Sequence, residues 1–366
     1  MKPRLILHIG SPKTGSSSIQ KALYDQRHRL RQTCDVHYAS TERAKAHDKH
    51  LSTTKASTSG DLEKADTEFK ALMLDFERSG AAHFFISEEQ MWTPKPTVAR
   101  FFKRFVPHFD VNVIAYVRRQ DLFVEGLYSQ HIRLSHYRDI PAITDFWHDP
   151  RVRGALDYHR VLSLLADVGL NVKALEFNTE VKTYGLMNSF LRATGFTDMG
   201  ELAERRANNS PDMRLLLTMC MLSAGRIEGE FNLLSNGIFR AARRLEQCGV
   251  FPTLKHTLGR IERQAIIDFA NESNTRLARD FGVVFPDNRP SEADLPILAP
   301  DAAYLLALIG DMALTDSVKF ANCCRGYLQS LAGVLPVSDA ALSDEDIAAM
   351  QLKGEELIVD GDSASL

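Results

Sequence analysis

The chain has 366 residues, of which 44% are hydrophobic and 25% charged, a composition typical of globular proteins with one large core or two modest ones. Its formal net charge of −3 argues against a general nucleic-acid-binding protein, which would carry an excess of basic residues. The five cysteines show no CxxC spacing, which favours reduced thiols and a cytoplasmic location. The apolar run before Gly10 is too short for a signal-peptide core, and no other run is long enough to span a bilayer.

The first half of the chain alternates predicted strands with predicted helices. Short apolar runs predict strands over residues 5–9, 83–87, 111–117 and 171–177. Helical spacing of apolar residues predicts helices over 16–32, 122–138, 154–168 and 183–194. Residues 40–66 are rich in Ser, Thr, Lys and His, and we expect a long loop there. Strands with little polar alternation, separated by helices, indicate an α/β fold with a parallel sheet covered on both faces.

From about residue 200 onward the periodicity is mainly helical. The predicted helices cover 212–225, 229–246, 258–281, 299–314 and 317–332. The end of the chain is acidic and is expected to be a solvated tail. We therefore predict an α/β core over 1–200, a helical part packed on it over 201–335, and a flexible tail over 336–366.

Three polar segments follow predicted strands, at 10–17, 87–89 and 118–121. Ligands of parallel α/β sheets bind at the carboxyl ends of the strands. If the strands are neighbours, these segments line one crevice.

The first of these segments has the composition of a phosphate-binding loop. Gly10 and Gly15 permit a tight turn, Lys13 adds a positive charge, and hydroxyl residues follow at the start of a helix. The glycine spacing is that of the ATPase loop GxxxxGK[ST], but Ser16 stands where that loop has its lysine. Because no apolar strand ends in an aspartate that would hold magnesium, the sequence does not favour a magnesium–nucleotide site.

The run Pro12-Lys13-Thr14-Gly15-Ser16-Ser17 resembles the 5'-phosphosulfate loop PK[ST]G[ST][ST] of sulfotransferases that use 3'-phosphoadenosine 5'-phosphosulfate (PAPS). The segment VIAYVRRQDLFVEGLYSQ resembles the second motif of this family, a strand ending in arginine followed by a helix. Arg118 matches the arginine, but Gly126 stands where the family has serine, and Ser129 lies one helical turn further on. The resemblance is to bacterial members, covers about residues 1–285, and is most specific in the first loop.

The resemblance implies a three-layer, P-loop-like fold and transfer of a sulfuryl group from PAPS to an acceptor hydroxyl. It implies that Pro12 to Ser18 hold the 5'-phosphosulfate, that Arg118 with Gly126 or Ser129 holds the 3'-phosphate, and that no metal is needed. Lys13 would neutralise the bridging oxygen. The acceptor would be a small molecule or glycan, with a carbohydrate hydroxyl favoured.

Such a reaction needs a base for the acceptor hydroxyl. Glu88 directly follows the predicted strand 83–87, and His50 lies in the polar segment 40–66, as does His47. Between Glu88 and His50, we favour Glu88 as the base because it directly follows a rigid strand. An ordinary solvated carboxylate and an ordinary loop histidine are the alternatives.

Two other functions stay open at this point. A nucleotide-dependent kinase would need magnesium and a metal-holding acid. A non-catalytic nucleotide-binding protein is suggested by Gly126 and by the lack of an obvious C-terminal RxG element. Neither reading involves a nucleic-acid partner.

Overall fold

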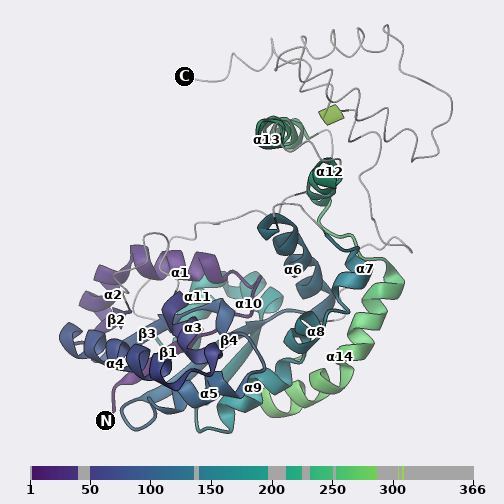
Figure 1. Ribbon diagram of the computed structural model, residues 1–366. Helices are drawn as coiled ribbons and strands as arrows, with labels where there is room; N and C mark the ends of the chain where they lie inside the picture. The colour runs from purple at the N-terminus through teal and green to yellow at the C-terminus, as the bar shows by residue number, and fades with distance from the viewer. Residues whose placement is uncertain are drawn as a thin grey trace, which may run out of the picture. The chain divides into compact units, whose positions relative to one another are not determined.

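A computed structural model of the chain describes residues 2–39, 50–135, 140–196, 212–224, 231–249 and 253–286, with residues 304, 307 and 308 (Figure 1). The described residues belong to two compact units. The first unit takes in 1–127, 143–209 and 258–295, and the second takes in 128–142, 210–257 and 296–366.

The centre of the first unit is a five-stranded sheet in the order β2-β3-β1-β4-β5. All four strand pairs are parallel. The strands are β1 (Arg4–His8), β2 (Val36–Tyr38), β3 (His83–Ser87), β4 (Asp110–Val117) and β5 (Asn171–Glu176). The α/β class and the parallel sheet are thus confirmed, with each predicted strand within one residue of its observed ends. The short strand β2 was not predicted.

Helices cover both faces of the sheet, so the unit has three layers. On one face, Ile19 and Leu23 of α1 and Phe190 of α11 pack in one core with Ile6 and Ile114 of the sheet. On the other face, Phe84 of β3 packs against Phe76 of α4, with 5.3 Å between ring centres. Figure 1 shows α1 and α11 on one side of the strands and α5 and α9 on the other.

The helices of this unit have the following bounds. They are α1 (Ser16–Asp25), α2 (Arg27–Cys34), α3 (Leu51–Ser59), α4 (Leu62–Ser79), α5 (Pro96–Lys103), α7 (Ile143–Phe146), α8 (Pro150–Leu156), α9 (Tyr158–Ala166), α10 (Phe177–Tyr184), α11 (Leu186–Thr194) and α14 (Arg260–Phe281), with the 3-10 turn η1 (Glu89–Met91). Helix α6 (Gln120–Leu134) contributes its first residues to this unit and the rest to the second.

Three predictions about this region were wrong in detail. The predicted helix over 16–32 is two helices that meet at Gln26. The predicted helix over 154–168 is also two, because Asp157 caps the second by accepting a hydrogen bond from the Arg160 N–H at 3.1 Å. The predicted loop 40–66 contains α3 and the start of α4, while residues 40–49, His47 included, lie outside the described residues.

The second unit contains α12 (Met213–Ala224) and α13 (Phe231–Gln247), close to their predicted bounds. Leu215 and Met219 of α12 pack with Ile238 and Ala241 of α13 and with Tyr304. The predicted helices 299–314 and 317–332 and the acidic tail lie outside the described residues, apart from residues 304, 307 and 308. The division at residues 200 and 335 stays a prediction; helix α14 belongs to the unit that holds the sheet.

None of the helices in the described ranges is both long enough and apolar enough to cross a membrane.

Candidate functional site

The three polar segments leave adjacent strands at the same edge of the sheet. Strand β1 lies between β3 and β4, and His8 is in register with Ser87 and Ile114. Past the end of β1, the Ser11 N–H donates to the carbonyl of Tyr116 at 2.7 Å. The Glu88 N–H donates to the carbonyl of His8 at 2.9 Å. The exits of β1, β3 and β4 therefore border one region, as the sequence predicts.

The loop between β1 and α1 is held in shape by its own hydroxyl groups. The Thr14 hydroxyl donates to the Ser11 carbonyl at 2.6 Å, and the Ser16 hydroxyl donates to the same oxygen at 3.3 Å. Both side chains are buried, whereas those of Pro12, Ser17 and Ser18 are partly exposed. The structure thus uses the Thr14 and Ser16 hydroxyls inside the loop, and helix α1 begins directly at Ser16.

Gly15 is the residue on which this turn depends. It has a φ of +77°, and a Cβ added there would lie 2.5 Å from Leu186 Cδ2 of α11. Lys13 also has a positive φ, +67°, a conformation that costs a non-glycine residue free energy and that concentrates at functional sites. The first turn of α1 contains no acidic residue, so its partial positive charge is not offset there.

Lys13 packs against the helix that follows β4. A Cβ added at Gly126 of α6 would lie 2.9 Å from Lys13 Cγ and 3.1 Å from Lys13 Cβ. The aliphatic part of Lys13 therefore occupies the space that a larger residue at position 126 would need. The two segments that carry the family resemblance meet at this contact.

Ser129, the predicted substitute for the missing serine, lies on α6 one turn after Gly126. Its side chain is buried, and its carbonyl accepts a hydrogen bond from Arg133 Nε at 3.4 Å.

Arg118 directly follows β4, and its carbonyl accepts a hydrogen bond from the Tyr158 hydroxyl at 2.7 Å. Its Nε is buried and donates to no atom of the described residues. Burial lowers the pKa of the Arg118 guanidinium, although the charges of Glu125 and Asp121 act in the opposite direction. Arg118 is therefore a partly buried cation with a side-chain donor to offer.

A buried ionic network fixes the helix behind Arg118. Arg119 binds Asp121 through two hydrogen bonds of 2.7 and 2.9 Å. Arg263 of α14 donates to Asp121 and to Glu125, each at 2.8 Å. Burial opposes the ionisation of Asp121, but the hydrogen bonds from Arg119 and Arg263 outweigh it and hold the pKa of that carboxyl below its usual range.

Glu88 lies at the exit of β3 and is fully buried. Its Oε1 accepts a hydrogen bond from the Gln90 N–H at 3.1 Å, which caps the turn η1. The local cap fixes the position of this carboxylate beside the loop that carries Lys13.

His50 is held between two backbone segments. The Ser87 N–H donates to His50 Nδ1 at 3.0 Å, and His50 Nε2 lies 2.9 Å from the Ala39 carbonyl, to which it donates. The ring is buried and lies edge-on to Tyr38, 5.2 Å between centres. Because both ring nitrogens bind the backbone, this arrangement supports a structural role for His50.

Sequence reasoning missed a second buried histidine at this edge, His8. Its Nδ1 hydrogen-bonds the Ser87 hydroxyl at 2.7 Å, and burial lowers the pKa of His8 to about 3. His8 is thus neutral at physiological pH. The signal available in the sequence was a single polar residue inside the apolar run 5–9.

Within the described ranges, no group of three or more His, Cys, Asp or Glu residues is placed to hold a metal ion. In comparisons with protein-family models, with curated proteins and with solved structures, nothing matches this chain.

Proposed function

We propose that the protein is a sulfotransferase that moves the sulfuryl group of PAPS to an acceptor hydroxyl. One observation carries the proposal: the lysine of the first loop packs on Gly126 of α6, the helix that follows Arg118. This contact joins, in space, the two segments whose residues resemble the PAPS-binding motifs. The strand order, with β1 between β3 and β4, supports the P-loop-like fold that the resemblance implies.

The donor would be held at two anionic groups. The 5'-phosphosulfate would bind at the start of α1. Its ligands there would be the first-turn N–H groups, the partly exposed Ser17 and Lys13. Arg118, with a buried Nε that has no described partner, suits the 3'-phosphate. Because Thr14 and Ser16 already donate to Ser11, we assign them to shaping the loop.

The reaction would be an in-line displacement at sulfur. The acceptor oxygen attacks the sulfur, the bond between sulfur and the 5'-phosphate oxygen breaks, and adenosine 3',5'-bisphosphate leaves. Lys13 would stabilise the charge that develops on the leaving oxygen. Glu88 would accept the proton of the acceptor hydroxyl, since it is buried and fixed at the neighbouring strand exit. The acceptor would be a carbohydrate hydroxyl, a proposal that rests on the family resemblance.

A magnesium-dependent kinase is the second candidate. The observation that favours it is the carboxylate of Glu88 at the exit of β3, next to the β1 loop. In a kinase that carboxylate would hold the metal of a nucleoside triphosphate.

Calorimetric titration separates the two candidates without knowledge of the acceptor. The sulfotransferase proposal predicts that adenosine 3',5'-bisphosphate binds in the presence of a metal chelator. It also predicts that Arg118→Ala weakens this ligand by about 1.5–3 kcal/mol, while adenosine 5'-phosphate, which lacks the 3' group, loses much less. Binding of ATP with magnesium alone would favour the kinase. If Arg118→Ala weakens the binding of both adenosine ligands equally, Arg118 does not bind the 3'-phosphate.

A further inference from the structure

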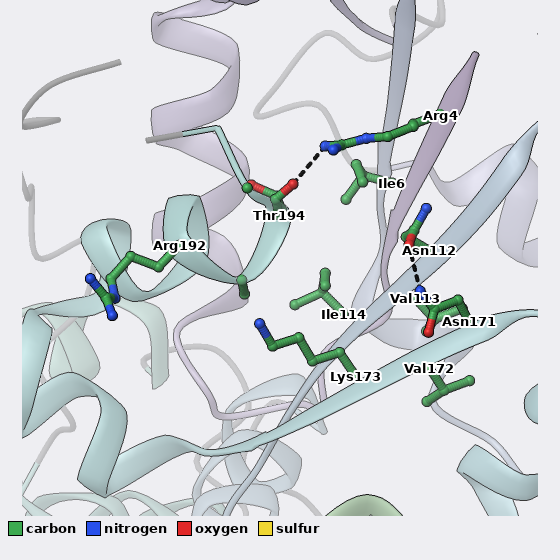
Figure 2. A pocket seen from close by; sticks show the side chains of 12 residues that line it. Arg4, Ile6, Asn112, Val113, Ile114, Asn171, Val172, Lys173, Arg192 and Thr194 are labelled. Atoms are coloured by element: carbon green, nitrogen blue, oxygen red, sulfur yellow. Dashed lines mark hydrogen bonds between the residues drawn. The ribbon is translucent and has the colours of Figure 1, made fainter. Parts of the chain in front are cut away.

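A cavity of about 440 Å³ lies at the opposite end of the sheet from the candidate site. Its floor is formed by residues 112–114 of β4, by the first residues of β5 and by Ile6, and its wall by the end of α11 with Arg4. Figure 2 shows this arrangement. The volume is within the range of about 300–1,000 Å³ found for small-molecule sites.

The floor carries two amide side chains, Asn112 and Asn171, among apolar residues of the strands. Asn112 is half-buried and interrupts the apolar run of β4, whose sequence is DVNVIAYV. It is in register with Asn171 of β5, and the Asn171 Nδ2 donates to Asn112 Oδ1 at 2.8 Å. Helix α11 ends at Thr194, with Gly195 as its left-handed cap, and no described helix residue beyond it lines the cavity.

Among the described residues, three cations and no acidic side chain line the cavity. Lys173 is exposed, and Figure 2 shows its amine pointing into the space. Arg192 lies at the rim, where its guanidinium stacks on Tyr184 at 4.4 Å. Asp110 is exposed and does not line the cavity. A concave surface with charges of one sign concentrates ligands of the opposite sign.

The Arg4 side chain is held in place by two contacts, and one of its N–H donors makes no hydrogen bond with the described residues. Its Nη2 donates to the Thr194 carbonyl at 2.6 Å, and its guanidinium lies over the Phe196 ring at 4.4 Å. Its Nε is buried and has no hydrogen-bond partner in the described ranges. A guanidinium held this way loses little freedom when it binds an oxyanion.

We infer that this cavity binds a phosphate or sulfate ester of a small polar molecule. The ester group would pair with Lys173 and Arg4, and the amides of Asn112 and Asn171 would hydrogen-bond the hydroxyl groups of the rest of the molecule. The site is separate from the β1 loop, because the cavity is at the amino ends of the strands and the loop is at their carboxyl ends. The inference does not depend on the proposed sulfotransferase activity.

The test is calorimetric titration of the full chain with glucose 6-phosphate and with glucose 6-sulfate, with glucose as the neutral probe. We expect saturable binding of at least one ester that weakens as salt increases, and no binding of glucose. A preference for one ester identifies the natural group and supports the site. Lack of saturable binding of either ester at millimolar concentration overturns it.

Substitutions test whether the ester binds in this cavity. Lys173→Ala should weaken the ester by roughly fivefold or more, and Lys173→Arg should retain it. Lys182 is also exposed, lies on α10 and does not line the cavity. Lys182→Ala is therefore the matched control and should bind as the wild type does. Lys13→Ala should also bind as the wild type does. Unchanged affinity in Lys173→Ala, or lost affinity in Lys13→Ala, contradicts the proposal.

Discussion

Lys13 and Gly126 are in direct contact: a Cβ added at position 126 would lie only 2.9 Å from Lys13 Cγ. The family that the sequence resembles has serine at this position. Here the missing side chain makes room for the lysine. A glycine in the middle of a helix costs about 0.5–1 kcal/mol of stability relative to alanine. The contact with Lys13 explains why α6 nevertheless has glycine at this position.

The first prediction uses this contact. Gly126→Ala should displace Lys13 and weaken adenosine 3',5'-bisphosphate by roughly tenfold, the scale of losing one hydrogen bond to a charged group. Gly126→Ser adds the same Cβ and should also weaken the ligand. Calorimetry measures both, and thermal unfolding should show no large loss of stability.

Gly154→Ala is the matched control, because a Cβ on that α8 glycine would meet only Pro94 Cγ, at an ordinary 3.6 Å. This variant should bind the nucleotide normally. Wild-type affinity in Gly126→Ala would show that the position of Lys13 does not matter for binding.

The second prediction separates the roles of Glu88 and His50. Glu88→Gln keeps the shape and the cap of η1 but removes the base. It should therefore lower the rate of sulfuryl transfer by about 10²-fold or more, with unchanged nucleotide affinity. The measurement is the transfer rate under saturating PAPS.

His50→Ala should act on stability instead. It leaves the Ser87 N–H and the Ala39 carbonyl without their ring partner, and each unpaired buried group costs about 1–3 kcal/mol. Urea unfolding measures this loss. If folded His50→Ala has no activity and Glu88→Gln is nearly normal, the two roles are reversed.

The third prediction concerns Arg263, which joins α14 to α6. Arg263→Ala leaves the buried carboxylates of Asp121 and Glu125 without this partner, and removing one member of a buried pair costs about 3–5 kcal/mol. Arg276→Ala on the same helix breaks only an exposed pair with Glu272 and should cost less than about 1 kcal/mol. Similar unfolding free energies for the two variants would show that the network contributes little.

The fourth prediction is a pH dependence. Burial lowers the pKa of His8 from 6.5 to about 3, so the unfolded chain binds one more proton than the folded chain between these values. Stability from this group is therefore present above pH 6.5 and falls as the pH decreases, by up to about 1.4 kcal/mol per pH unit. Lowering the pH from 7 to 5 should cost about 2 kcal/mol through His8 alone.

Comparison of wild type with His8→Gln by urea unfolding at both pH values isolates this effect. Glutamine still offers a partner to the Ser87 hydroxyl but does not titrate. The variant should lose about 2 kcal/mol less than the wild type on acidification. His28→Gln, at an exposed position, should behave as the wild type. An identical pH response in His8→Gln would mean that His8 does not contribute to it.

The sequence predicted the elements whose signal is local. The strand over 83–87 has the apolar centre Phe84-Phe85-Ile86, and the turn at Gly15 was recognised from its composition. Helix α3 was missed because its sequence, LSTTKASTS, has poor helix propensity. Contacts distant in the sequence support it: the Ser52 and Thr53 hydroxyls donate to Glu68 at 2.9 and 2.8 Å.

The candidate site was predictable in its composition and not in its contacts. The family resemblance singled out Lys13 and Arg118. It could not show that Lys13 packs on Gly126 or that Arg263 reaches Asp121, because these pairs are far apart in the chain. It also could not show that both ring nitrogens of His50 bind backbone groups.

The role of Lys13 is tested most directly by the rate at which adenosine 3',5'-bisphosphate is released from PAPS. This rate is measured for the wild type and for Lys13→Ala, with a sugar acceptor or water. The wild type should release it without added metal. Lys13→Ala should be slower by about 10²-fold or more, the scale of losing one electrostatic contact to the developing charge. A near-normal rate in folded Lys13→Ala would contradict the assignment of this loop to the phosphosulfate.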